Sequence, residues 1–200
     1  MKDVKVVVEN FARYDDQAAF RQFYMHYYAK LFRFSLYYVR HEVIAEEVIA
    51  DVFVKIWNNR IRMLEIDNLD IYLFTSVKNQ SLSYLKRKNM LLAKLEKYDS
   101  IALINRYNPE RELIGNELIE KVNQAINLLP PKCQVIFKLS RDEGFKYDEI
   151  ADILGLSKST VKNQMTSALA KIKDELSSYF EDDKEVPTYS IYPARSSKSL

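Results

Sequence analysis

Residues 146–173 read KYDEIADILGLSKSTVKNQMTSALAKIK, and this stretch decides the fold of the C-terminal part of the chain. Its first half places Ile150 and Ile153 at helical spacing. Gly155 follows, and a glycine just past a helix end most easily adopts the left-handed conformation that stops a helix. Ser157 can then cap a second helix. The stretch therefore predicts two helices joined by a tight turn, which is a helix-turn-helix.

The second of these helices has a polar face without acidic residues. Amide and hydroxyl groups suit base edges, and ammonium groups suit phosphates. A plain helical hairpin is the alternative, because two helices joined by a glycine-containing turn are common. The cap and the acid-free face together favour DNA binding. The predicted DNA-reading residues are Ser157, Lys158, Ser159, Thr160, Lys162, Asn163, Gln164, Thr166 and Ser167.

Composition narrows the class of protein. The chain has 200 residues, 48% of them hydrophobic, which suffices for one large domain or two small ones. A net charge of +2 is too small to indicate nucleic-acid binding by itself, so a basic surface must be local. The single cysteine, Cys133, rules out an internal disulfide and is expected to be a small buried residue rather than a nucleophile. Without a signal peptide or an apolar run of about 18 residues, we expect a cytoplasmic protein that does not insert into a membrane.

Long stretches of three-to-four-residue periodicity, with only 3 Gly and 5 Pro, predict an all-α fold. Residues 5–8 have β-branched character, but this run is too short and too terminal to build a sheet. The periodicity weakens after about residue 89 and resumes near residue 110, so we expect two small helical domains joined by a flexible linker. The predicted division is a domain at 10–90, a linker at 91–110, a helix-turn-helix domain at 111–178 and a polar tail at 181–200.

The first predicted helix carries an aromatic stripe, and Asp15 or Asp16 can cap it. Aromatic side chains at helical spacing are usually core packing, and we interpret the stripe in this way rather than as a cofactor site. His26 and His41 have no partner at metal-ligand spacing, so no metal site is predicted. The stripe consists of Phe20, Phe23, Tyr24, Tyr27, Leu31, Phe34 and Tyr38.

A second helix is predicted over residues 43–58, with Glu46, Glu47 and Asp51 outside its wide apolar face. Three interpretations are open for this acidic cluster. It could hold a divalent ion for phosphoryl chemistry, form a solvated helix face, or dock on a basic protein partner.

A third helix is predicted from residue 69 to about residue 87, with Asp67 as its cap. No acidic residue occurs from 71 to 95, and basic side chains alternate with aromatic ones there. Basic groups bind phosphates and aromatic rings stack on exposed bases, so this composition suits melted DNA. A solvated basic face over core aromatics is the alternative.

These elements, in this order, resemble the extracytoplasmic-function (ECF) group of bacterial sigma factors over residues 16–176. Residues 45–60, AEEVIADVFVKIWNNR, are similar to the segment of that family that docks on the clamp helices of RNA polymerase. Residues 71–88, IYLFTSVKNQSLSYLKRK, are similar to its helix for the −10 promoter element. Residues 128–169, LLPPKCQVIFKLSRDEGFKYDEIADILGLSKSTVKNQMTSAL, are similar to its −35-reading domain.

The resemblance implies a sigma factor that directs promoter-specific transcription initiation, with no enzymatic activity, cofactor or small-molecule substrate. The implied partners are core RNA polymerase, promoter DNA and an anti-sigma factor. The implied docking residues are Glu46, Glu47, Asp51, Phe53 and Trp57. The implied −10 residues are Lys78, Asn79, Ser83, Tyr84, Lys86, Arg87 and Lys88.

Two other classes of protein compete with this interpretation. A regulator with a receiver domain also ends in a helix-turn-helix, but its N-terminal half needs alternating strands and helices. A metal-dependent nuclease built on Glu46, Glu47 and Asp51 needs a further carboxylate or histidine nearby, which no second motif supplies.

Overall fold

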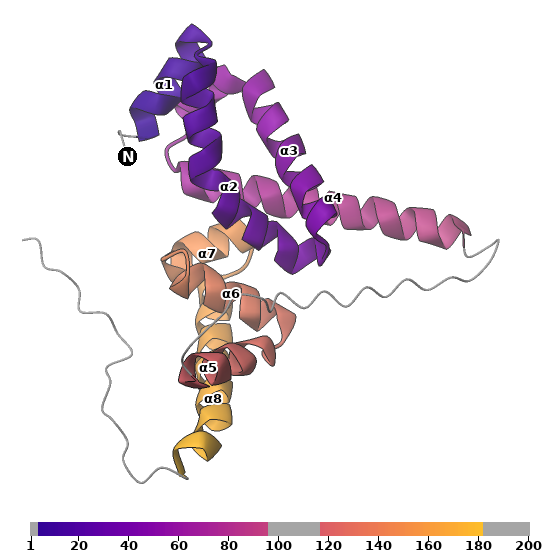
Figure 1. The fold of residues 1–200 in the computed structure, drawn as a ribbon, viewed down its shortest axis with the longest axis vertical. Helices are drawn as coiled ribbons and strands as arrows, with labels where there is room; N and C mark the ends of the chain where they lie inside the picture. Colours follow the sequence, from indigo (N-terminus) through magenta and orange to yellow (C-terminus); the bar gives the residue numbers. More distant parts are fainter. Residues whose placement is uncertain (1–3, 96–116, 182–200) are drawn as a thin grey trace, which may run out of the picture.

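The computed structural model describes residues 4–95 and 117–181, and within these two ranges every regular element is a helix, as predicted. Figure 1 shows two groups of helices that lie against each other. The N-terminal group consists of α1 (Val4–Tyr14), α2 (Gln17–Val39), α3 (Glu42–Asn58), the 3-10 helix η1 (Arg60–Glu65) and α4 (Leu69–Leu95). The C-terminal group consists of α5 (Glu117–Asn127), α6 (Pro131–Arg141), α7 (Tyr147–Leu154) and α8 (Lys158–Glu181).

The aromatic stripe of α2 forms the N-terminal core, as predicted. Asp16 caps this helix, because its carboxylate accepts hydrogen bonds from the main-chain N–H groups of Ala18 at 2.9 Å and Ala19 at 3.0 Å. Phe23 is 1% exposed and its ring lies 6.1 Å from that of Phe53 on α3. These ring contacts fix α3 on α2.

Helix α1 covers residues for which no element was expected. Its β-branched residues form a helix because Val7, Val8 and Phe11, at most 4% exposed, pack onto the aromatic core. Tertiary packing therefore overrides a weak local preference.

Helix α4 differs from expectation at both ends. Its first turn is capped by Asn68, whose side-chain oxygen accepts the N–H of Ile71 at 3.0 Å, and not by Asp67. It continues to Leu95, beyond the expected end near residue 87, and projects past the bundle in Figure 1. The rest of the predicted linker, 96–110, and the predicted tail after residue 181 lie outside the described residues.

The helix-turn-helix forms as predicted from α7 and α8. Gly155 adopts φ 69°, the left-handed conformation that ends α7. Ser157 caps α8, because its Oγ accepts the N–H of Thr160 at 3.1 Å. The side chains of Ile153 and Val161 are fully buried between the two helices and their neighbours.

One hydrophobic cluster spans both domains, whereas a second, smaller cluster lies within the C-terminal domain. The ring of Phe74 on α4 meets that of Phe145, just before α7, with centroids 4.9 Å apart and planes at 80°. The ammonium of Lys138 on α6 lies 4.6 Å from the ring centroid of Tyr37 on α2. Buried residues of α4, α6 and α7 therefore belong to a single cluster.

No described helix is long and apolar enough to cross a membrane.

Candidate nucleic-acid interface

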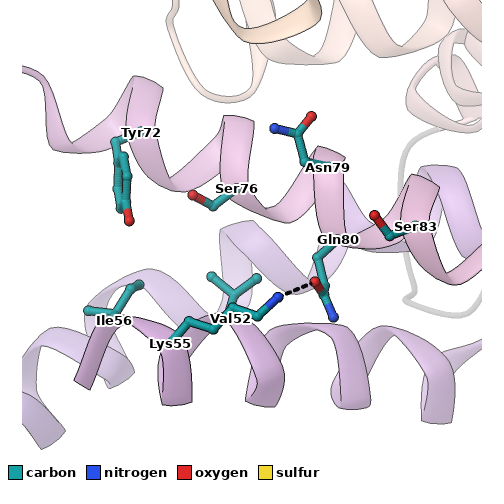
Figure 2. A pocket seen from close by; sticks show the side chains of 8 residues that line it. All are labelled: Val52, Lys55, Ile56, Tyr72, Ser76, Asn79, Gln80 and Ser83. Carbon is teal, nitrogen blue, oxygen red and sulfur yellow. Dashed lines mark hydrogen bonds between the residues drawn. The ribbon is translucent and has the colours of Figure 1, made fainter. Parts of the chain in front are cut away.

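A cavity of about 290 Å³ lies between α3 and α4 (Figure 2). Polar side chains dominate the α4 side, whereas Val52 and Ile56 of α3 form an apolar floor. The ring of Tyr72 is 38% exposed and points from α4 toward α3. The lining residues are Val52, Lys55, Ile56, Tyr72, Ser76, Asn79, Gln80 and Ser83.

Two of the lining residues, Lys55 and Gln80, belong to a chain of hydrogen bonds. The ammonium of Lys55 donates to the Gln80 side-chain oxygen at 2.6 Å, which Figure 2 shows as a dashed line. The Gln80 amide nitrogen in turn donates to a carboxylate oxygen of Asp51 at 2.7 Å. Gln80 is 8% exposed, so one buried amide joins two charged groups of α3.

The sequence had placed seven residues at the −10 helix, and the structure brings two of them, Asn79 and Ser83, into the cavity wall. Lys86, Arg87 and Lys88 lie exposed further along α4, where they form a basic surface. Tyr72, one of the aromatic residues predicted to alternate with basic ones on this helix, also lines the cavity. Sequence reasoning missed the other polar lining residues, which are Lys55, Ser76 and Gln80.

Lys78 does not line the cavity with Asn79 and Ser83, although all three were predicted to contact the −10 element. Its ammonium donates a hydrogen bond of 2.6 Å to the main-chain carbonyl of Ile153, near the C-terminus of α7. Burial in this contact lowers the pKa of Lys78. The side chain is therefore engaged by the C-terminal domain and does not line the cavity. Tyr84 also differs, because its half-buried ring packs against the core.

The acidic face of α3 is exposed, with Glu46, Glu47 and Asp51 all on the outer side of the helix. Phe53 was implied as a docking residue, but it is 3% exposed and packs in the aromatic core, so it supports the helix from inside. Trp57 is half-buried, with its ring 4.9 Å from that of Phe20.

Among the described residues, no three His, Cys, Asp or Glu side chains are grouped so that they could hold a metal ion.

The recognition face of α8 is exposed, with two exceptions. Thr160 is half-buried. Gln164 is half-buried, and its side-chain oxygen accepts a hydrogen bond of 2.7 Å from the thiol of Cys133 on α6. Cys133 is buried, as predicted. Lys158 forms an ion pair of 2.8 Å with Asp148 of α7 across the turn. The exposed residues of the face are Ser157, Lys158, Ser159, Lys162, Asn163, Thr166 and Ser167.

Comparison with known families agrees with this geometry. Residues 23–90 match the family Sigma-70 region 2, and residues 119–172 match the family Sigma-70, region 4. The chain is a promoter-recognising sigma factor. It belongs to the sigma-70 family, and its assignment to the ECF group is confirmed.

Individual relatives cover most of the chain. It is 22% identical over 162 residues to the RNA polymerase sigma factor YlaC of Bacillus subtilis (strain 168), covering 80% of this chain and 94% of that protein. Its fold is similar to that of the sigma factor RpoE in complex with the anti-sigma factor NepR from Bartonella quintana. That match has a TM-score of 0.57 at 20% identity, over 79% of this chain and 96% of RpoE. CnrH, solved in complex with the cytosolic domain of CnrY, matches with a TM-score of 0.55 at 20% identity, over 90% of this chain and 99% of CnrH.

Proposed function

We propose that the two domains divide the reading of a promoter between them. The N-terminal domain docks on core RNA polymerase through the acidic face of α3 and traps bases of the melted −10 element in the cavity between α3 and α4. The C-terminal domain reads the −35 element as duplex DNA through the exposed face of α8. The observation that carries this proposal is the polar cavity beside the basic surface of α4.

The cavity has the size and chemistry for an extruded base. Its volume of about 290 Å³ is at the small end of ligand pockets, which favours a single base over a longer ligand. The exposed ring of Tyr72 offers a stacking surface, and the Asn79 amide and the Ser83 hydroxyl offer hydrogen bonds. Stacking of this kind is worth roughly 1–3 kcal/mol per base. Lys86, together with its basic neighbours on α4, would hold the phosphates.

Simultaneous reading of both elements requires the domains to separate. Elements centred about 25 base pairs apart lie about 85 Å apart along B-DNA, since each base pair adds about 3.4 Å. In the packed arrangement the ammonium of Lys78 touches α7, directly before the recognition helix. Docking on core polymerase would supply the free energy for this separation.

We further propose an anti-sigma factor as a regulatory partner, acting in the cytoplasm where core polymerase and promoter DNA are found. Support comes from RpoE, a relative in fold that was solved in complex with the anti-sigma factor NepR.

Permanganate footprinting on paired and pre-opened templates tests the division. The promoter would be one recovered by transcription of a genomic library with core polymerase. Asn79→Ala should impair opening on the paired template and regain part of its activity on a pre-opened bubble. Asn163→Ala should weaken initiation most at promoters with a good upstream element, and a bubble should not restore it. Identical behaviour of the two variants on both templates would contradict the division.

A further inference from the structure

The side chain of Gln80 separates two opposite charges on one face of α3. Its oxygen accepts from the Lys55 ammonium at 2.6 Å, and its nitrogen donates to the Asp51 carboxylate at 2.7 Å. Only this orientation of the amide works, because an ammonium solely donates and a carboxylate solely accepts. Both partners therefore fix the amide, and at 8% exposure Gln80 itself has little contact with water.

Asp51 and Lys55 would otherwise pair with each other. They lie four residues apart on a helix with the acid first, which is the favourable order for an ion pair. Yet within residues 4–95 no direct ion pair joins them, and each contacts Gln80 instead. Each charged group of α3 therefore has the Gln80 amide of α4 as its hydrogen-bond partner instead of the opposite charge.

This separation matters because the two charges face different surfaces. Lys55 lines the cavity, and Asp51 lies with Glu47 on the exposed acidic face. The amide takes up one N–H of the ammonium and leaves it two further N–H groups. A direct ion pair would leave both groups ionised but turn each toward the other, and it would draw the ammonium away from the cavity.

We propose that Gln80 is a positioning residue that holds the Lys55 ammonium at the cavity for an anionic or carbonyl-bearing group of DNA and keeps Asp51 out of a direct ion pair, available to a basic protein surface. The roles given to the two surfaces rest on the proposed function, whereas the position assigned to the Lys55 ammonium does not. One helix then serves two partners of opposite charge, with the group that holds the two charges apart supplied by the neighbouring helix.

The first arm of the test is structural and does not depend on function. A crystal structure of the full-length Gln80→Leu protein should show the Lys55 ammonium within about 4 Å of the Asp51 carboxylate, the usual limit for an ion pair. If the ammonium still points into the cavity, the proposal is wrong. Ser81→Ala is the matched control, because Ser81 is buried next to Gln80 and bonds Ser35 of α2 at 3.2 Å. In that variant Lys55 should stay in place.

The second arm measures promoter opening at saturating core polymerase by permanganate reactivity. Gln80→Leu and Lys55→Met should each lower opening about tenfold, the loss expected for a hydrogen bond to a charged group. The double variant should be no worse than either single one, because Gln80 acts through Lys55. Losses that multiply would overturn the proposal. If Lys55→Met opens the promoter normally while Lys55 still swings to Asp51 in the variant structure, the positioning stands and the role proposed for the cavity fails.

Discussion

The ammonium of Lys78 lies 2.6 Å from the carbonyl oxygen of Ile153, so α4 is bonded directly to the first helix of the helix-turn-helix. A cation is favoured there, because the C-terminus of α7 carries a partial negative charge. A Cβ placed on Gly155 would lie 4.0 Å from the same ammonium, so the turn before α8 is also near Lys78. The two proposed DNA-reading helices, α4 and α8, are thus linked through Lys78 and this turn.

Loss of an interdomain ion pair should shift the domains apart. Arg33 of α2 and Glu143, just before α7, are 3.4 Å apart, and Arg33 is 58% exposed. Pairs of this exposure contribute about 0.2–1 kcal/mol, so Arg33→Glu should lower the docked-to-separated ratio about 1.4- to 5-fold. Fluorescence energy transfer between dyes on the two domains measures this ratio. The swapped variant Arg33→Glu, Glu143→Arg should restore it, and an unchanged ratio in Arg33→Glu would exclude a role for the pair.

Domain docking should strengthen as pH rises from about pH 8 to about pH 10. Burial lowers the pKa of Lys78 and of Lys138, which lies over Tyr37 of the other domain. Docking of the two domains therefore buries these amines in their charged form. The free-energy cost of this burial is fully present below the lowered pKa values. The cost disappears as pH rises through them toward the ordinary lysine value of about 10.4. Tyr37, whose pKa burial raises, opposes this only above its ordinary value of about 10.

The same energy-transfer measurement, taken across this pH range, checks the direction. Lys78→Met, Lys138→Met is the control, and its docked fraction should vary less with pH. A docked fraction that falls between these pH values in the wild-type chain would contradict the expected sign.

Local signals predicted the elements of this fold well because helix stops and caps involve neighbouring residues. Gly155 ends α7 and Asp16 caps α2 as expected. Helix α1 was not predicted, because the β-branched residues at 5–8 favour an extended chain. The spacing of Val4, Val7 and Phe11 on one helical face is the signal that could have revealed it.

The site was harder to predict because it depends on contacts between distant residues. Phe53 and Lys78 were given site roles through the resemblance to the family, yet one is in the core and the other bonds α7. A signal for Gln80 was present, since this polar residue follows Leu73 and Val77 on the buried stripe of α4. Its partners on α3 could not be inferred from the sequence, because nothing local fixes how the two helices face each other.

Charge reversal on the acidic face of α3 should strongly weaken docking on core polymerase. Glu46→Lys, Glu47→Lys should weaken binding about tenfold or more, because a basic partner surface would meet two like charges. Circular dichroism should stay unchanged, since both side chains are exposed. Glu65→Lys, an exposed acid on η1, is the matched control and should bind normally. Co-elution of the double variant with core at wild-type strength would place the docking surface elsewhere.

Replacement of the neighbouring residues Asn163 and Gln164 of α8 by Ala should have different effects on base preference. Asn163 is exposed, and its replacement by Ala should cost about 1–3 kcal/mol of discrimination at one position of the −35 element. Gln164→Ala should change base preference little, because its oxygen already accepts from Cys133, and should instead lower the unfolding temperature. Transcription from a set of promoters with single −35 substitutions separates the two effects. A larger specificity change in Gln164→Ala than in Asn163→Ala would mean that Gln164 reads DNA.

The most direct test of the central claim is transcription in vitro from a fragmented genomic library with purified core polymerase and this protein. The wild-type chain should direct initiation from a discrete set of start sites that share two upstream elements, and the Glu46→Lys, Glu47→Lys variant should not. Initiation no different from that of core polymerase alone would contradict the assignment of this chain as a sigma factor that binds polymerase and reads promoters.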